Sequence, residues 1–195
     1  MGPHHEFPSE PEVQALVARA QDGDTAAFER LYQHFFAPIY RYTAFRTSGD
    51  VAEDVVAEIF VRAWEKLHRY KPHKGVPFGA WLFRIARHAV IDVYRKDHEV
   101  VELSDDTADP DALNRADASF RQREIVRIVR DALEQLPRRY REVLSLCYIA
   151  DLSTEDAARV LHLTSGAVRI LKFRALRKLE LQLPAGLCER SPDFS

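Results

Sequence analysis

Hydrophobic residues recur at steps of three and four along most of this 195-residue chain, which is the spacing of one face of an α-helix. The alternation of apolar and polar residues that a half-buried β-strand requires is not found in any segment. The pattern therefore predicts an all-α fold. Helices are expected over residues 13–20, 25–42, 51–70, 77–96, 119–136, 138–149, 153–161 and 165–179.

Residues that begin or bend helices lie at these boundaries. Thr25 is expected to cap the second helix, because its hydroxyl can accept a hydrogen bond from a free backbone N–H. Pro38 is expected to kink or divide that helix, since proline supplies no backbone N–H. Asp50, with Glu53 three residues later, predicts a capping box at the start of the third helix.

The predicted helix over residues 77–96 combines an apolar face with cations and aromatic rings. Its basic residues gather on a neighbouring face and just beyond it: Arg84, Arg87, His88, Arg95 and Lys96. Its aromatic residues lie among them: Phe78, Trp81, Phe83 and Tyr94. Cations hold phosphates and flat rings stack on unpaired bases, which is typical of single-stranded nucleic-acid binding. The alternative for this segment alone is a core helix with a solvated basic side.

The segment before this helix, residues 71–76, is predicted to be a loop because it contains Pro72 and Gly75. Its His73 and Lys74 suit a neighbouring phosphate, although a solvated loop explains them equally well.

The predicted helix over residues 51–70 has an acidic outer strip. Asp54, Glu58 and Glu65 form the strip. Phe60 and Trp64 are large apolar residues on the same helix, and the pattern leaves open whether they belong to the core or to a contact surface. Exposed acids beside an apolar contact suit docking on a basic protein surface.

The sharpest local pattern runs from residue 152 to residue 179 and indicates a helix-turn-helix. Ser153 can cap a short helix, residues 162–164 form a turn, and Val168 and Ala175 belong to the buried side of a second helix. Its cations point outward: Arg169, Lys172, Arg174, Arg177 and Lys178. A recognition helix in the DNA major groove has this layout. An ordinary helical hairpin with a solvated basic face is the alternative.

Charge is distributed unevenly along the chain, although the net charge is only −2. Residues 97–118 carry eight acidic side chains and one arginine, lack helical periodicity and are expected to be a linker. The predicted organisation is a loose N-terminus or tag remnant over residues 1–12, two helical domains over residues 13–96 and 119–183, and a tail over residues 184–195.

Composition narrows the class of protein. A hydrophobic content of 46% with 30% charged residues favours a soluble folded protein over a disordered one. No apolar run approaches the roughly 18 residues that span a bilayer, so membrane insertion is not expected. Cys147 and Cys188 lack a C-x-x-C partner, which argues against a zinc site and favours reduced thiols in a cytoplasmic protein.

In their order along the chain, these segments resemble an extracytoplasmic-function (group IV) bacterial RNA polymerase sigma factor. DVAEDVVAEIFVRAWEKL resembles the region that docks on the polymerase β′ clamp helices. PFGAWLFRIARHAVIDVYRK resembles the segment that melts and recognises the minus-ten element. The stretch from Leu136 to Leu179 resembles the domain that recognises the minus-thirty-five element.

The resemblance implies roles for individual residues. Contacts to core polymerase are expected from Asp54, Glu58, Phe60 and Trp64, with the β flap as a further polymerase contact. Contacts to the minus-ten element are expected from His73, Lys74, Phe78, Arg84, Arg87, His88, Asp92, Arg95 and Lys96. Contacts to the minus-thirty-five element are expected from Ser165, Arg169, Lys172, Phe173, Arg174, Arg177 and Lys178. Trp81 is expected to wedge between helices. The linker acids either mimic nucleic acid in the polymerase RNA path or form a solvated tether.

Three positions depart from the family pattern. His162 stands where the family usually has glycine in the turn, and histidine tolerates a positive φ better than most residues. Ile170 and Leu171 replace a Ser-Arg pair that is common in the family, so a promoter sequence cannot be transferred from better-known members.

The predicted function is a sigma factor that binds core RNA polymerase and promoter DNA, with an anti-sigma factor as a partner implied by the resemblance. No nucleophile–base pair or metal-ligand spacing is found, so no enzyme activity, metal or cofactor is predicted. A stand-alone helix-turn-helix repressor or activator is the main alternative, but it assigns no function to the acidic helix and the aromatic, basic helix within residues 51–96. An RNA-binding adaptor would explain the aromatic residues but leave the helix-turn-helix unused.

Overall fold

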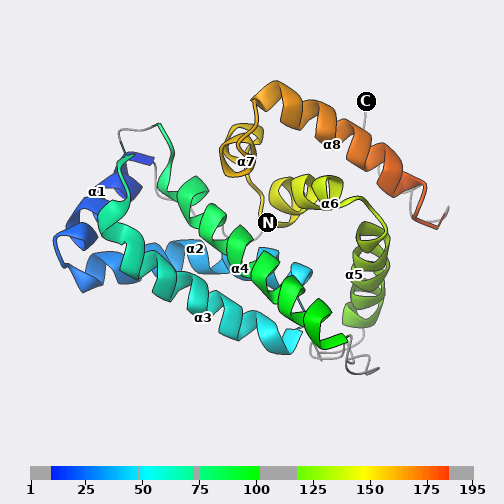
Figure 1. Cartoon of the computed structure of the whole chain (residues 1–195), viewed down its shortest axis with the longest axis horizontal. Helices are drawn as coiled ribbons and strands as arrows, with labels where there is room; N and C mark the ends of the chain where they lie inside the picture. Colours follow the sequence, from blue (N-terminus) through cyan, green and yellow to red (C-terminus); the bar gives the residue numbers. More distant parts are fainter. Residues whose placement is uncertain (1–9, 48, 73–74, 102–117, 185–195) are drawn as a thin grey trace.

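The computed structural model describes residues 10–47, 49–72, 75–101 and 118–184, and the regular structure within these ranges is helical (Figure 1). This confirms the predicted all-α class. A 3-10 turn η1 (Leu67–Arg69) follows α3, and a π-helical turn η3 (Ser145–Ile149) follows α6. The α-helices are α1 (Glu10–Gln21), α2 (Thr25–Arg46), α3 (Gly49–Lys66), α4 (Phe78–Val101), α5 (Ala118–Glu134), α6 (Arg138–Leu144), α7 (Thr154–Leu161) and α8 (Ser165–Glu180).

Helices α1 to α4 form one bundle, in which α2 contacts the other three helices (Figure 1). Its core consists of the apolar residues that recur at helical spacing, and the largest of them are at most 1% exposed: Leu31, Ile39, Tyr42, Ile59, Phe78, Leu82 and Phe83. Burying one such side chain contributes about 1.5–3 kcal/mol. The apolar faces therefore position the exposed faces of α3 and α4.

Helix α2 begins at Thr25 as predicted, but its capping residue is Asp24 rather than Thr25. Asp24 Oδ1 accepts a hydrogen bond from the Ala27 N–H at 3.0 Å, and Oδ2 accepts from Arg19 Nη2 at 2.6 Å. These two donors lower the pKa of the Asp24 carboxyl. A carboxylate at a helix N-terminus also interacts favourably with the helix dipole, so the acidic neighbour takes the role expected of Thr25.

Pro38 does not divide α2, which continues from Thr25 to Arg46. The missing N–H removes one backbone hydrogen bond. Ile39 and Tyr42, just after the proline, are both 0% exposed, and their burial holds the helix in place across this position.

Most helix boundaries differ from the predicted ones by one to five residues, and two of these differences bear on the expected cap of α3 and on the expected linker. Helix α3 begins at Gly49, one residue before the expected capping residue Asp50, whose side chain lies outside the described residues. Helix α4 continues to Val101, five residues into the segment predicted as a linker. The boundary expected at residue 96 is therefore not the end of a helix, and residues 102–117 lie outside the described part of the chain.

The C-terminal half contains the predicted helix-turn-helix, formed by α7 and α8. Ser153 Oγ accepts from the Asp156 N–H at 3.0 Å and caps α7, and Thr164 Oγ1 accepts from the Ala167 N–H at 3.2 Å and caps α8. His162 has φ 57° and ψ 41°, the left-handed conformation expected at the turn. The Leu163 N–H then bonds the Ala158 carbonyl at 2.9 Å, which closes the end of α7.

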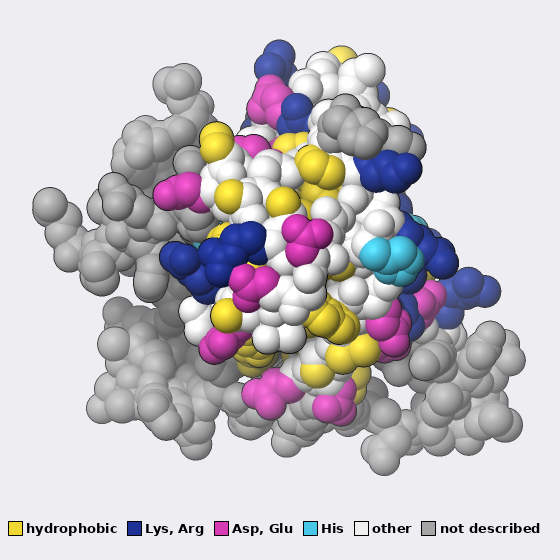
Figure 2. Space-filling view, turned by 90° about the vertical axis from the view of Figure 1, so that its left-hand side faces the viewer, with side chains coloured by type: hydrophobic (Ala, Val, Ile, Leu, Met, Phe, Trp, Pro, Cys, Tyr) yellow, Lys and Arg dark blue, Asp and Glu magenta, His cyan; other side chains and the backbone are white. Residues whose placement is uncertain are grey.

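The two halves lie against each other in this structure. Helix α4 contacts α7, and α2 contacts η3, while α8 lies on the outer side of α6 and α7 (Figure 1). The end of the molecule at the left of Figure 1 carries acidic and basic side chains interspersed (Figure 2).

A pair of substitutions on α3 tests this assignment of core and surface. Ile59 is 0% exposed and Val61 is 57% exposed on the same helix. We expect Ile59→Ala to lower the free energy of unfolding by about 2–5 kcal/mol, because it leaves a cavity, and Val61→Ala to change it by at most about 0.5 kcal/mol. Chemical unfolding of the full chain followed by circular dichroism measures both. Equal losses in the two variants would contradict the assignment.

Candidate nucleic-acid interface

The start of α4 is fixed by a cluster of aromatic rings. The Phe78 ring centroid lies 5.4 Å from that of Phe35, 5.6 Å from that of Tyr70 and 5.4 Å from that of Trp81. The Trp81 ring is half-buried and its centroid also lies 5.3 Å from that of Tyr70, and its expected place between helices stays a prediction. Phe78 is only 1% exposed, so the prediction that it contacts DNA is corrected: the cluster covers its ring, and Phe78 positions α4 instead.

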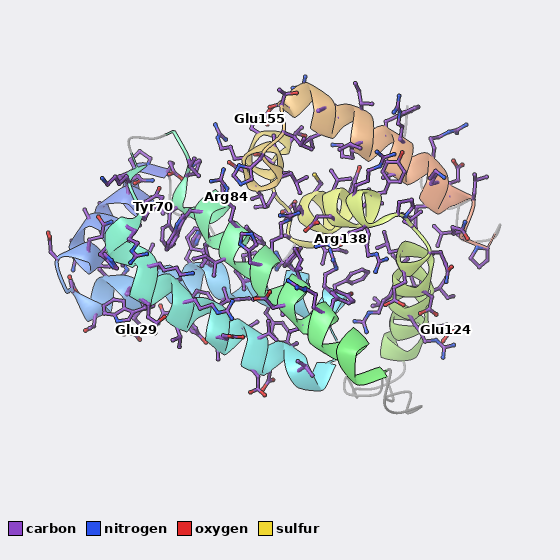
Figure 3. The ribbon with its side chains drawn as sticks, viewed as in Figure 1. Glu29, Tyr70, Arg84, Glu124, Arg138 and Glu155 are labelled. Atoms are coloured by element: carbon purple, nitrogen blue, oxygen red, sulfur yellow. The ribbon has the colours of Figure 1, made fainter. Side chains whose placement is uncertain are left out.

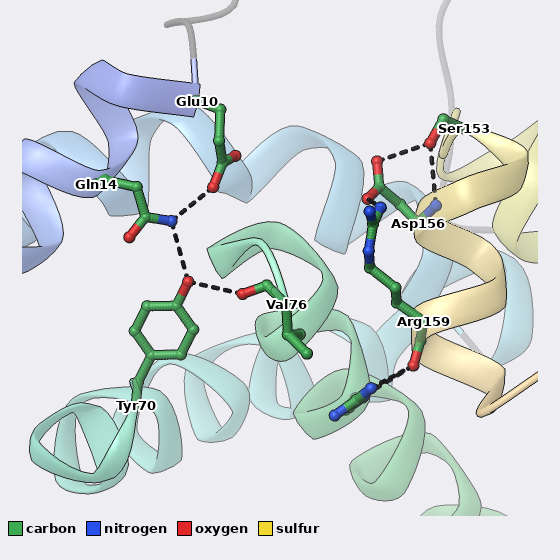
Figure 4. A network of polar contacts seen from close by, with 8 residues as sticks. Glu10, Gln14, Tyr70, Val76, Ser153, Asp156 and Arg159 are labelled. Atoms are coloured by element: carbon green, nitrogen blue, oxygen red, sulfur yellow. Dashed lines mark hydrogen bonds and ion pairs between the residues drawn. The ribbon is translucent and has the colours of Figure 1, made fainter. Parts of the chain in front are cut away.

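Tyr70 ties the segment before α4 to α1. Its hydroxyl donates to the Val76 carbonyl at 2.9 Å and accepts from Gln14 Nε2 at 3.0 Å (Figure 4). Gln14 in turn donates to Glu10 Oε1 at 2.6 Å. Burial raises the pKa of Tyr70, which keeps the hydroxyl protonated and able to donate. These bonds hold Tyr70 and Val76, and with them the backbone that leads into α4, against α1.

Arg84 points from α4 toward α7 (Figure 3). Its Nε and Nη2 donate to the Arg159 carbonyl at 3.0 and 2.5 Å. That carbonyl lies in the last turn of α7, where backbone oxygens have no helical partner. The Arg159 side chain is held by Asp156 at 2.9 Å, and Asp156 accepts from Ser153 Oγ at 2.7 Å (Figure 4).

Arg87, one turn further along α4, forms an ion pair with Glu142 of α6. Arg87 Nε donates to Glu142 Oε1 at 2.8 Å, and the Tyr42 hydroxyl donates to the same oxygen at 3.4 Å. Glu142 is only 3% exposed, and burial raises the pKa of Tyr42 well above its usual value. A buried carboxylate is costly unless cations and hydrogen-bond donors surround it, so this pair couples the two halves.

Two further arginines join the halves through backbone carbonyls. Arg41 Nε of α2 donates to the Ile149 carbonyl at 3.2 Å, and Arg130 Nη2 of α5 donates to the Ala44 carbonyl at 2.9 Å. In addition, the Arg84 charge lowers the pKa of His162 in the helix-turn-helix turn, with smaller contributions from burial, Arg87 and His88.

The other predicted minus-ten residues lie in different surroundings. His88 and Arg95 are exposed, and Asp92 Oδ2 lies 3.4 Å from Arg62 Nη1 of α3. His73, Lys74 and the side chain of Lys96 lie outside the described residues.

The exposed face of α8 carries most of the predicted minus-thirty-five residues. Arg169, Phe173, Arg174, Arg177 and Lys178 are exposed, while Ser165 is half-buried in the first turn. Arg169 Nη2 lies 3.5 Å from Glu155 Oε1, and Arg177 Nη1 lies 3.4 Å from Glu180 Oε2. Among the described residues, no hydrogen-bond or ion-pair partner is found for the side chain of Arg174, which is exposed.

Lys172 lies to the side of this face. It is half-buried, and its ammonium group lies 5.8 Å from the centroid of the Tyr148 ring in η3. Cys147 is half-buried beside it, and burial raises the pKa of its thiol. Lys172 therefore contacts the protein itself rather than extending from the helix into solvent.

The outer face of α3 carries Asp54 and Glu58 as expected, both exposed. The sequence left open whether Phe60 and Trp64 belong to the core or to a contact surface. Phe60 is 6% exposed and belongs to the core, whereas Trp64 is 40% exposed. Trp64 packs edge-on against Phe28 at 4.8 Å between ring centroids. For Phe60, a direct polymerase contact is therefore corrected to a supporting position beneath the surface.

Among the described residues, His, Cys, Asp and Glu side chains do not cluster in threes at metal-binding distance. None of the described helices combines the length and the apolar character that crossing a membrane requires.

Comparison with known proteins identifies the family. The model of Sigma-70 region 2 matches residues 23–99, and the model of Sigma-70, region 4 matches residues 126–179. The ECF RNA polymerase sigma factor SigM of Bacillus subtilis is 31% identical over 153 residues, which cover 78% of this chain and 92% of SigM. The chain belongs to the ECF sigma factors. This sigma factor therefore functions in transcription initiation.

Two other known proteins are similar over most of the chain. The ECF sigma factor BldN of Streptomyces coelicolor is 33% identical over 172 residues, which cover 87% of this chain and 65% of BldN. The structure of CnrH in complex with the cytosolic domain of CnrY superposes with a TM-score of 0.67 at 30% identity. That match covers 92% of this sigma factor and 99% of CnrH.

Sequence reasoning missed three residues that the structure brings forward. Glu142 is a buried charge, and its place in the strongly charged stretch over residues 138–143 gave no signal of burial. Val61 and Ile170 are 57% and 55% exposed apolar residues on the faces of α3 and α8 that carry the predicted contacts. Both lie outside the buried periodicity of their helices, which was a detectable signal.

Neutralising Glu142 tests the coupling between the halves. We expect Glu142→Gln to shift the equilibrium toward separated halves by roughly ten-fold or more, because Arg87 loses a charged hydrogen bond worth about 1.5–3 kcal/mol. Small-angle X-ray scattering should then report a larger radius of gyration. Glu155→Gln is the control, since its partner Arg169 lies in the same half. A radius of gyration that stays the same in Glu142→Gln would mean that this pair does not couple the halves.

Proposed function

We propose that this sigma factor directs core RNA polymerase to one class of promoters, with α4 binding the unpaired minus-ten strand and α8 binding the minus-thirty-five duplex. The observation that carries the proposal is that one chain presents two basic elements, α4 and α8, on separate helical bundles. A stand-alone helix-turn-helix repressor needs only α8, and this alternative leaves the arginines of α4 without a nucleic-acid role.

For α8, the layout fits the major groove. The N-terminal part of a recognition helix contacts base edges, and cations further along contact phosphates. We assign base contacts to Ser165, Arg169 and Arg174, and phosphate contacts to Arg177 and Lys178. Arginine suits this role because its planar group donates two parallel hydrogen bonds to one guanine.

For α4, binding of the strand requires the two halves to separate. Arg84 and Arg87 donate to a carbonyl and a carboxylate of the C-terminal half, and these oxygens occupy the donors that a phosphate would take. His88 and Arg95 are exposed and remain available for the strand in the closed arrangement. The predicted contacts of Asp92, His73, Lys74 and Lys96 remain part of the proposal.

The outer face of α3 is proposed to dock on the β′ clamp helices of the polymerase. Asp54, Glu58 and Trp64 offer acids beside an aromatic ring, and we add Val61 because it is exposed on the same face. The β flap is the proposed second polymerase contact.

We further infer an anti-sigma factor as a regulatory partner, as the resemblance implies. The similar protein CnrH forms a complex with the cytosolic domain of CnrY, which supports binding of a protein partner. A partner of core RNA polymerase acts in the cytoplasm, where we place this sigma factor. Its action is binding rather than catalysis, and no cofactor is assigned.

The sigma and repressor functions differ in what they need to bind DNA. We expect the purified protein alone to give no specific shift of promoter duplexes. Mixed with core polymerase, it should give specific starts in run-off transcription on a library of genomic promoters. A specific shift by the protein alone, without a polymerase complex, would favour the repressor.

Two arginine substitutions test the assignment of base contacts on α8. We expect Arg169→Ala and Arg174→Ala each to weaken recognition of the minus-thirty-five element by about 1–3 kcal/mol and to relax specificity at one base position. Affinity of the holoenzyme for the cognate promoter and its single-base variants measures this.

Lys178→Ala is the matched control for these variants. Because Lys178 is proposed to contact a phosphate, its loss should weaken binding to all sequences alike. It should also reduce the slope of log affinity against log salt concentration by about 1. Unchanged transcription from the cognate promoter in both arginine variants would remove the site assignment.

A further inference from the structure

Helix α8 exposes two large apolar side chains at the centre of its outer face. Ile170 is 55% exposed and Phe173 is 66% exposed, whereas Val168 and Ala175 on the opposite side are 0% exposed. An α-helix turns by roughly 100° per residue, so residues three apart are neighbours on one face. Ile170 and Phe173 therefore form one apolar pair, which points away from the protein.

The surroundings of this pair indicate what covers it. On the helix surface Arg169 flanks the pair on one side and Arg174 on the other, and Arg177 follows Phe173 one turn later. Isolated exposed apolar residues are common on protein surfaces. An adjacent pair framed by three exposed cations is different, because its covering surface must be both anionic and locally apolar.

The DNA major groove has this combination. Phosphates line its edges, and the C5 methyl group of thymine is the apolar group that its base edges present. Neither isoleucine nor phenylalanine has a side-chain group that can hydrogen-bond a base, so dispersion and desolvation are what such contacts supply.

We propose that Ile170 and Phe173 together recognise thymine methyl groups in the minus-thirty-five element, so that this sigma factor selects promoters with thymines opposite the middle of α8. The inference rests on the proposed function of α8. The resemblance implied a DNA contact for Phe173, and the new elements are the role of Ile170, the pairing of the two and the group that they recognise.

The test removes single methyl groups from the DNA. The minus-thirty-five sequence is first taken from promoters that the wild-type holoenzyme transcribes. Each thymine in it is then replaced by deoxyuridine, which lacks only the C5 methyl group, and holoenzyme affinity is measured. We expect a loss of about four-fold per contacted methyl, equivalent to about 0.8 kcal/mol.

Variants link this loss to the two side chains. Ile170→Ala and Phe173→Ala should each bind the thymine promoter more weakly and lose the response to deoxyuridine at one position. Leu181→Ala is the control, since Leu181 is 82% exposed just beyond the end of α8 and should keep the full response. The deoxyuridine series uses wild-type protein, so it remains decisive if a variant fails to fold.

Three outcomes would overturn the inference. The first is equal affinity for thymine and deoxyuridine at every position, and the second is a deoxyuridine response that persists in both variants. The third is weaker binding of Ile170→Ala to core polymerase without any change in the deoxyuridine response, which would assign the pair to a protein partner. In each case a loss of affinity in Arg174→Ala keeps the proposed function of α8. Insensitivity to Arg174→Ala and to the minus-thirty-five sequence would refute both together.

Discussion

The arrangement of the two halves depends on the buried charge of Glu142. This carboxylate of α6 is 3% exposed, and its neighbours Arg87 of α4 and Tyr42 of α2 come from the other half. A charge in such a place is tolerated only while a cation and a hydrogen-bond donor face it. Since both donors belong to helices of the first bundle, Glu142 restricts how α6, and with it α7 and α8, can lie against α4.

The same constraint links the closed arrangement to DNA binding. Arg84 and Arg87 bind oxygen atoms in the closed protein and, under the proposed function, phosphate or base oxygens in the open complex. The guanidinium donors of these two residues then have oxygen partners in both states, so separation of the halves does not leave Arg84 or Arg87 without a partner. The Glu142 carboxylate instead becomes hydrated when the halves separate, and this hydration recovers the free energy lost on its burial. The two states therefore differ less in free energy than the number of broken contacts indicates.

The three-and-four spacing of apolar residues predicted the helices well, because burial of an apolar face is what stabilises each helix. The cap at Ser153 follows from residue type and position, whereas the left-handed turn at His162 was expected from the family pattern, which has glycine there. Contacts between distant segments could not be predicted from the sequence. Arg87 and Glu142 are 55 residues apart, and local spacing cannot show that their helices meet. Phe78 was expected at the DNA surface, and only its packing against Phe35 and Tyr70 shows that its ring is buried. The contacts to DNA and polymerase remain predictions.

The exposed face of α8 separates two physical tasks. The positive charge of Arg169, Arg174 and Arg177 acts over about 8 Å at physiological ionic strength and attracts any phosphate backbone, so this long-range attraction adds affinity without distinguishing sequences. The base-edge hydrogen bonds proposed for Arg169 and Arg174 discriminate only at contact distance. Apolar contacts act only at van der Waals distance, so Ile170 and Phe173 respond to a base edge only after the phosphates are engaged. Under the proposed function, the cations of α8 therefore bind DNA first and its apolar pair discriminates afterwards, which would account for two large apolar side chains outside the core.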